Sequence, residues 1–251
     1  MTFDPVIATL LEALPGPDPA GEDASEIYAA IRDARREDDP SLPRGPWEHE
    51  LKRADWKRVE DLAVATLIAR SKDLQIAAYL CEAWIRIHGF AGLAPGLALV
   101  EGLCARYWGQ LYPRSDVEPG SEYRLNVIAW LDRRIPVALS AVPVVIDAAD
   151  PGRRYSWSDY KAAQAYERLR EADPQMPLDR PSLAMIRDCA AHTDVALLDA
   201  VASEMDRAAA ILASLGATLD RLCGPESPSL ANLDEAITGI GHFVSAARAG
   251  G

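Results

Sequence analysis

The stretch LAPGLALVEGLCARYWGQLYP, residues 93–113, decides the fold class. Its large apolar side chains recur every three or four positions, at Leu93, Leu97, Val100, Cys104, Tyr107, Trp108 and Leu111. That spacing places them on one face of an α-helix. The pair Tyr112-Pro113 then ends the pattern, because proline cannot continue a helix. Residues 93–111 are therefore predicted to form a helix that buries one face in a core.

The same period continues in the neighbouring segments, each of which follows a side chain that can cap a helix. Asp55, Ser71 and Ser121 are the three predicted caps. Gly89 can end the second of these helices, since glycine readily adopts the left-handed conformation that often follows a helix. Four apolar stripes of this kind predict a helical bundle. Shorter helices are predicted at residues 6–14 and 26–36, and an irregular proline-rich loop at residues 38–47.

Helical periodicity fails in residues 133–157, which we predict to be a connector with at most a minor hairpin. Helices are expected again at residues 158–172 and 183–192. A long helix then shows a seven-residue repeat of apolar pairs, from Leu198/Val201 to Leu219/Leu222. Gly224-Pro225 stops this helix, and a last apolar stripe follows from Ser229, so the chain is predicted to end in a helical hairpin.

The fold class expected from these patterns is all-α, with an N-terminal helical bundle followed by a second helical domain that ends in the long hairpin. We place the domains at residues 1–145 and 146–251. The repeat of apolar pairs also offers a possible association seam, made by Leu198, Val201, Met205 and Leu212. This seam can pack against the last helix of the same chain or support a weak homodimer through the C-terminal half.

Composition excludes several classes of protein. The 251 residues carry 26 Lys and Arg against 38 Asp and Glu, a formal net charge of −12, and 49% of them are apolar. Disorder is excluded by the apolar content, and nucleic acid is an unfavourable partner because its binding draws on clustered basic residues. The four cysteines show no disulfide or zinc spacing. Neither an export signal nor a span long enough to insert in a membrane is evident, so we expect a cytoplasmic protein.

No catalytic constellation, cofactor motif or metal site is predicted. The common nucleophile and phosphate-loop signatures are absent. Cys189 and His192 are two possible metal ligands at helical spacing, but a structural zinc needs four. Gly89, Gly92 and Gly96 follow a helix rather than a strand and are interpreted as helix punctuation. We therefore expect a protein that is not an enzyme and that needs no cofactor.

Several short motifs resemble a known family when they are taken in order. They are Pro19-Ala20-Gly21-Glu22-Asp23, Asp55-Trp56-x-x-Val59, Ser71-Lys72-Asp73-Leu74, Gly89-Phe90-Ala91-Gly92-Leu93, Tyr107-Trp108, Leu111-Tyr112-Pro113 and Arg124-Leu125-Asn126. Their order and spacing resemble the ImpA-type N-terminal domain of the TssA proteins of bacterial type VI secretion. A weaker resemblance to the middle domain of that family follows in Arg154-Tyr155-Ser156 and around Gly224-Pro225. Ala20 departs from the Cys or Ser of many relatives.

The resemblance implies a structural assembly component that engages the baseplate, the membrane complex and the tail sheath and tube in the bacterial cytoplasm. The family motif residues are expected to be mostly structural: Gly21, Glu22, Asp23, Trp56, Ser71, Lys72, Asp73, Gly89, Gly92, Tyr107, Trp108, Pro113, Arg124 and Asn126. The ring-forming C-terminal domain of the family is not expected within these residues. The alternative function is a helical interaction scaffold outside secretion.

Overall fold

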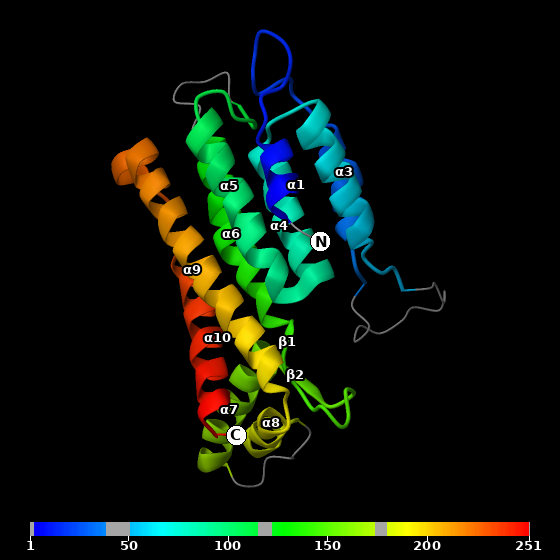
Figure 1. Ribbon diagram of the computed structural model, residues 1–251, viewed down its shortest axis with the longest axis vertical. Helices are drawn as coiled ribbons and strands as arrows, with labels where there is room; N and C mark the ends of the chain where they lie inside the picture. The colour runs from blue at the N-terminus through cyan, green and yellow to red at the C-terminus, as the bar shows by residue number, and fades with distance from the viewer. Residues whose placement is uncertain (1–2, 39–50, 115–121, 174–179, 251) are drawn as a thin grey trace.

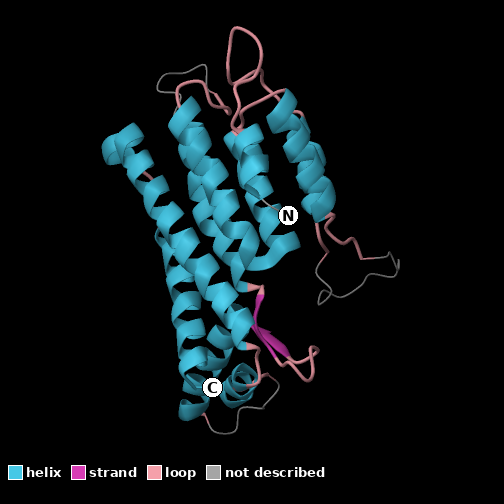
Figure 2. Cartoon of the chain, in the orientation of Figure 1, coloured by secondary structure: helices cyan, strands magenta, loops and turns pink. Residues whose placement is uncertain are grey.

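The computed structural model describes residues 3–38, 51–114, 122–173 and 180–250. Most of them are helical, and a two-stranded sheet is the one sheet within these ranges (Figure 2). The all-α fold class is therefore confirmed. The predicted cap at Ser121 and nearly all of the predicted loop at residues 38–47 lie outside the described residues.

The N-terminal half is a bundle of four long helices: α3 (Trp56–Ala69), α4 (Leu74–His88), α5 (Leu93–Tyr107) and α6 (Glu122–Ser140). Helix α4 lies between the other three and contacts each of them (Figure 1). Two short helices are added to this bundle. Helix α1 (Phe3–Leu10) packs on α3 and α5, and α2 (Ile27–Arg35) packs on α3.

Helix α4 forms the centre of the core because it is apolar around most of its circumference. Its side chains from Ile76 to Ile85 are all buried. By length and composition, Leu74–Tyr107 could cross a membrane, but 67% of its most apolar window is buried inside the protein. The 3₁₀ turn η1 (Gly89–Gly92) also divides this stretch into two helices that fold back on each other. The stretch is the core of the bundle.

Two capping predictions have different outcomes. Asp55 accepts a hydrogen bond from the Arg58 amide at 2.9 Å and caps α3, as predicted. The cap of α4 is Asp73, not Ser71: its carboxylate accepts from the Ile76 amide at 3.0 Å. Ser71 is unsuited to that role because it lies in an extended segment paired with Gly21.

Helix α6 runs to Ser140 with Pro136 inside it, so the prediction that helical structure fails from residue 133 is wrong. Proline in a helix interior costs roughly 3 kcal/mol. The flanking side chains Ile135 and Leu139 are buried, and burying an aliphatic side chain of this size contributes about 1.5 to 3 kcal/mol. Burial of this last turn therefore outweighs the proline.

A short antiparallel hairpin follows α6, as expected for the connector. Strand β1 (Pro143–Ile146) pairs with β2 (Arg154–Ser156). Helix α7 (Trp157–Ala172) then starts at a capping box, in which Ser156 and Asp159 each accept the other's backbone amide. Ser182 caps α8 (Leu183–Ala191). The hairpin therefore turns the chain directly into the lower end of the molecule, where α7 and α8 lie (Figure 1).

The chain ends in the predicted helical hairpin. Helix α9 (Val195–Cys223) stops at Gly224, whose φ of 54° is left-handed, and α10 (Ala231–Gly250) returns along it. Both helices also pack on the N-terminal bundle, α9 along α5 and α10 along α6 (Figure 1). Buried side chains from both halves belong to one cluster. The division at residue 145 remains a prediction about independent stability.

Candidate functional site

Three of the motifs meet at the upper end of the bundle (Figure 1). The segment 71–73 lies between residues 20–22 and residues 111–113, because Gly21 bridges Ser71 and Asp73 bridges Tyr112. The Lys72 amide donates to the Ala20 carbonyl at 2.8 Å, and the Lys72 carbonyl accepts from the Tyr112 amide at 3.0 Å. We call residues 20–23, 70–73 and 111–113 the motif clasp.

Gly21 is required by the backbone of the clasp. Its φ of 81° is left-handed, and a Cβ atom there would lie 2.1 Å from the Arg70 carbonyl oxygen. Glu22 then pairs with the Arg70 guanidinium at 3.3 Å. Asp23 accepts from the Ser25 amide at 2.8 Å, and hydrogen bonding to Ser25 lowers its pKa. All three residues of this motif hold the turn that leads into α2.

Lys72 is fully buried, and its ammonium group joins two helix ends. Nζ donates to the Leu10 carbonyl at 2.9 Å, where α1 ends, and to the Leu67 carbonyl at 2.6 Å, in the last turn of α3. A cation at a helix C-terminus is favourable because it opposes the negative end of the helix dipole. Burial disfavours the charged form of the side chain and lowers the pKa of Lys72 to about 8.

Asp73 is also buried, and both of its carboxylate oxygens are used. Oδ1 caps α4, and Oδ2 accepts from the Tyr28 hydroxyl at 2.6 Å, which fixes α2 to the clasp. Burial raises the pKa of Asp73, while the hydrogen bonds from Tyr28 and the backbone oppose that shift. The Ser71 hydroxyl is buried and has no hydrogen-bond partner among the described residues.

The aromatic motif residues Tyr107 and Trp108 hold the same end of the bundle. The Tyr107 hydroxyl donates to the Leu11 carbonyl at 2.9 Å, just beyond α1. The guanidinium of Arg124 lies 5.1 Å from the Trp108 ring and donates to the Leu111 carbonyl at 2.9 Å. Pro113 follows Tyr112 through a cis peptide bond.

The remaining motif residues lie away from the clasp. Gly89 ends α4 with a φ of 62°, and a Cβ atom on Gly92 would lie 2.3 Å from the Trp84 backbone carbonyl. These two glycines therefore allow a tight turn between α4 and α5. Trp56 lies 5.4 Å beneath the Arg86 guanidinium. Asn126 is exposed on α6 and joins none of these contacts.

Sequence reasoning missed a buried ion cluster around Glu82. This carboxylate is fully buried in α4 and pairs with Arg35 from α2 and with Arg134 from α6, whose Nε lies 3.0 Å away. Arg35 also lies over the rings of Tyr79 and Trp130. The available signal was a single charge within the apolar stretch 76–85, because such a charge is retained only when it is paired.

A second missed carboxylate, Asp132, connects the two halves of the chain. It is buried on α6 and accepts from the Leu233 amide at 3.0 Å and the Asn232 side chain at 2.6 Å. It therefore satisfies one of the N-terminal amides of α10, which lack partners within the helix.

The four seam residues are covered within the chain. Leu198, Val201, Met205 and Leu212 have exposed fractions of 2 to 5%. They lie on α9, which packs against α5 and α10. This burial matches the intrachain alternative, so a homodimer would need another surface.

The ionisable groups of the clasp serve structural bonds rather than a reactive cleft. Among the residues that the structure describes, no group of three or more His, Cys, Asp or Glu side chains could hold a metal ion. Cys189 and His192 have other contacts: the thiol lies 3.4 Å from the Arg153 carbonyl, and His192 Nδ1 lies 2.7 Å from the Asp188 carbonyl. The arrangement can orient helices, and it offers no convergent acid, base and nucleophile.

Comparison with known proteins agrees with the motif resemblance. Residues 11–133 match the family described as ImpA, N-terminal, type VI secretion system. The type VI secretion system component TssA1 of Pseudomonas aeruginosa is 33% identical over 129 residues, which are 50% of this chain and 37% of that protein. The match therefore spans little more than a third of the relative.

A solved structure is similar over the whole chain. It is the N-terminal domain, including the conserved ImpA_N region, of the TssA component from Burkholderia cenocepacia. The TM-score is 0.84 at 28% sequence identity, with 100% of this chain and 96% of that chain covered. Matching motifs, a matching family region and a matching fold lead to one conclusion: the chain belongs to the TssA family of type VI secretion components, and it carries the ImpA_N domain of that family.

Proposed function

We propose that this chain is a non-catalytic docking module of a type VI secretion apparatus in the bacterial cytoplasm. It engages proteins of the baseplate, the membrane complex and the tail sheath and tube while the apparatus assembles. The family assignment supports the secretion context, since the relatives in P. aeruginosa and B. cenocepacia are both TssA components of type VI secretion.

The observation that carries the proposal is how the motif clasp uses its charged side chains. Lys72 and Asp73 are buried, and they bond to the ends of α1, α3 and α4 and to Tyr28. A buried charge is costly unless its partners are provided. These charges therefore fix a rigid helical frame, and the outer faces of the helices are left to bind other proteins.

The alternative is a helical scaffold that acts outside secretion. It predicts the same rigid frame but different partners, so a binding measurement separates the two. An enzyme would instead need titratable groups converging on a cleft, and the buried ionisable groups of the clasp converge on backbone carbonyls and amides.

The test is a binding panel. The full chain is immobilised and exposed separately to the purified baseplate, membrane-complex, sheath and tube proteins from the same bacterium. An acidic helical protein with a similar net charge serves as the control for nonspecific attraction. We expect saturable binding of at least one component at micromolar concentration. Binding of none of them, with the folded state of the chain verified by circular dichroism, would contradict the proposal.

A further inference from the structure

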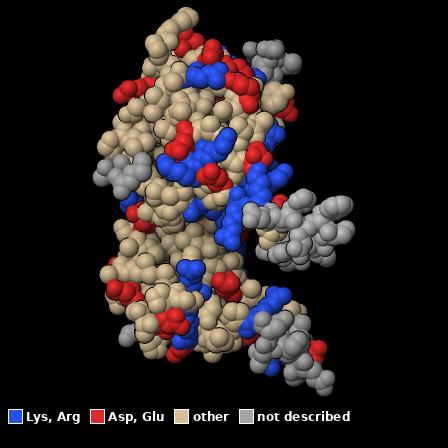
Figure 3. Space-filling model, turned by 90° about the vertical axis from the view of Figure 1, so that its right-hand side faces the viewer, with Lys and Arg blue, Asp and Glu red and all other residues tan. Residues whose placement is uncertain are grey.

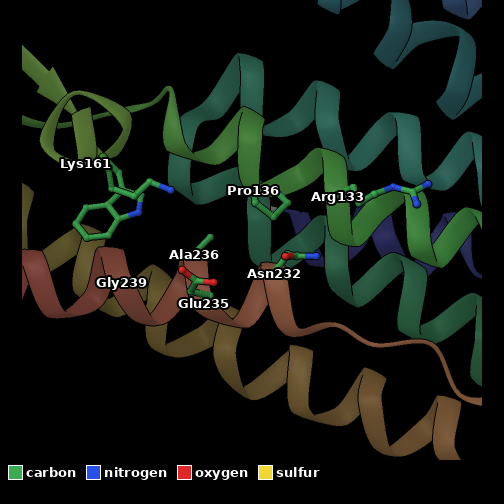
Figure 4. A pocket seen from close by; sticks show the side chains of 8 residues that line it. Arg133, Pro136, Lys161, Asn232, Glu235, Ala236 and Gly239 are labelled. Atoms are coloured by element: carbon green, nitrogen blue, oxygen red, sulfur yellow. The ribbon is translucent and has the colours of Figure 1, made fainter. Parts of the chain in front are cut away.

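Two hollows lie next to each other along the outer face of α10. The first has a volume of about 340 Å³ and is formed between α6, α7 and α10 (Figure 4). Pro136 on α6 and Ala236 and Gly239 on α10 form apolar parts of its wall, and Lys161 reaches in from α7. Such a hollow can receive an aliphatic or aromatic side chain.

The second hollow has a volume of about 300 Å³, and its α10 residues begin one helical turn after the last α10 residue of the first. Tyr160 and Phe243 form its aromatic wall, and Ala246 and Ala247 line the helix side. Since these α10 residues follow those of the first hollow at helical spacing, both hollows open along one face of the same helix.

An aromatic cluster forms the ridge between the two hollows. Trp157 lies against Gly239, where a Cβ atom would come within 2.7 Å of the indole ring. Trp157 also stacks on Tyr160 with centroids 5.3 Å apart, and Tyr160 contacts Phe243 at 4.5 Å. The ridge is therefore fixed by packing. We call the two hollows and this ridge the α10 groove.

The charge around the α10 groove is opposite to that of the whole chain. Arg133 and Lys161 line the first hollow and Arg187 lines the second, and all three are exposed. None of them forms an ion pair or side-chain hydrogen bond in the part of the chain that the structure describes, whereas Arg35, Arg70, Arg114 and Arg153 are all paired. Among the described residues that line the two hollows, Glu235 is the one acidic side chain.

We propose that the α10 groove binds an acidic amphipathic helix of a partner protein. Its apolar side chains fill the two hollows, and its carboxylates lie beside Arg133, Lys161 and Arg187. The centres of the hollows are separated by nine or ten residues along α10, which is about 14 Å at 1.5 Å per residue. Apolar residues on one face of the bound helix at i, i+7 and i+11 lie about 10 and 16 Å from the first, which brackets that separation.

The basic side chains and the apolar hollows of the groove together favour an acidic amphipathic helix over other partners. A purely apolar helix would leave three cations beside it without counterions, and nucleic acid would leave the apolar hollows empty. An acidic helix with an apolar stripe satisfies both features of the groove. Attraction between the groove and such a helix also guides their encounter and weakens at high salt. This inference rests on the proposed docking function and names the partner class for one surface.

The probe is a fluorescein-labelled helical peptide with leucines at i, i+7 and i+11 and glutamates on the flanking positions, measured by anisotropy with the full chain. A second peptide carries lysine in place of every glutamate. We expect saturable micromolar binding of the acidic peptide and at least tenfold weaker binding of the basic one. Equal binding of both peptides, or no saturation with either, would overturn the inference.

Charge reversal locates the binding surface. The double variant Arg133→Glu/Lys161→Glu should weaken binding at least tenfold, and Ala246→Trp, which fills the second hollow from an exposed position, should weaken it as well. The matched control is Arg36→Glu/Arg58→Glu, which changes the net charge equally. Arg36 and Arg58 lie near Asp33 and line neither hollow. Figure 3 shows that the face on the α3 side carries further basic side chains. If the control loses as much affinity as the groove variant, the groove is not the site.

The same variants separate this inference from the proposed function. If a secretion component binds the chain and the groove variants leave that binding unchanged, the docking function stands and the inference is overturned. If the acidic peptide binds the groove and no component binds, the inference stands and the docking function is wrong. Light scattering of the chain alone adds a further outcome: a dimer that the groove variants dissociate would make a second copy the occupant and overturn the partner class.

Discussion

The substitution Lys72→Met tests whether the buried ammonium group joins the ends of α1 and α3. Methionine has a similar volume but cannot donate to the Leu10 and Leu67 carbonyls, which accept from Nζ at 2.9 and 2.6 Å. Each unsatisfied buried acceptor costs about 1 to 3 kcal/mol. The substitution also removes the cost of burying a charge, so the two effects oppose each other at pH 7.

The pH dependence separates these effects because burial lowers the pKa of Lys72 from 10.5 to about 8. Between these two values the unfolded chain holds more protons than the folded chain, so the free energy of unfolding rises with pH. The contribution of Lys72 to stability is therefore smallest below pH 8 and is recovered as the pH approaches 10.5. Between pH 7 and pH 9.5 the gain is about 2 kcal/mol, at 1.36 kcal/mol per pKa unit.

Urea denaturation of the wild type and of Lys72→Met at both pH values measures this gain. Other groups titrate equally in both proteins, so their effects cancel in the difference. We expect the stability of the wild type relative to the variant to increase by about 2 kcal/mol from pH 7 to pH 9.5. A relative change below about 0.5 kcal/mol would refute the reasoning. If the variant does not fold, an NMR titration of the Lys72 side chain gives its pKa directly, and a value near 10.5 would be the refuting result.

Four further predictions concern the frame and its association. Gly21→Ala should destabilise the chain by about 2 kcal/mol or more because its Cβ would meet a backbone carbonyl. The control Gly216→Ala, in open space on α9, should raise the stability by about 0.5 to 1 kcal/mol. Thermal denaturation of both variants measures these changes. Arg35→Ala should lower the free energy of unfolding by about 3 kcal/mol or more, since it leaves the buried Glu82 carboxylate with one partner. The control Arg207→Ala, at an exposed ion pair, should lower it by less than about 0.5 kcal/mol. Urea denaturation measures both changes. Limited proteolysis should cut first in the turn at residues 147–152, outside the helices, and a first cut inside α6 would count against the proposed domain boundary. Light scattering at low micromolar concentration should show a monomer or a weak dimer, because the α9 seam is already covered; a fixed assembly of ten or more subunits would contradict this expectation.

The helices were predictable from sequence because their apolar side chains repeat with the helical period. The seven-residue repeat anticipated α9, and the glycines at 89 and 224 marked two helix ends where the structure has positive φ. Pro136 misled the prediction because the burial of neighbouring side chains is invisible to a local rule. Asp73 and Ser71 are both good capping residues, and only the start of α4 at Leu74 distinguishes them.

The contacts that build the clasp were less predictable, because they depend on segments far apart in the sequence. Lys72 reaches a carbonyl 62 residues earlier in the chain, and Glu82 receives its arginines from 47 residues before and 52 residues after it. Local patterns show that such groups are polar without showing what they meet. The same holds for the α10 groove, whose walls come from α6, α7, α8 and α10. The family resemblance supplied the order of the motifs, and the structure supplies their contacts.

The most direct test of the docking function is sheath assembly in living cells of the source bacterium. Fluorescently tagged sheath protein is followed in a strain from which the gene for this chain has been deleted. The same strain is then complemented with one of three forms: the wild type, the groove variant Arg133→Glu/Lys161→Glu or the control variant Arg36→Glu/Arg58→Glu. We expect extended sheaths to be lost on deletion, to return with the wild type and the control variant, and to stay reduced with the groove variant. Sheaths that form at the normal frequency in the deletion strain would contradict a role for this chain in type VI assembly.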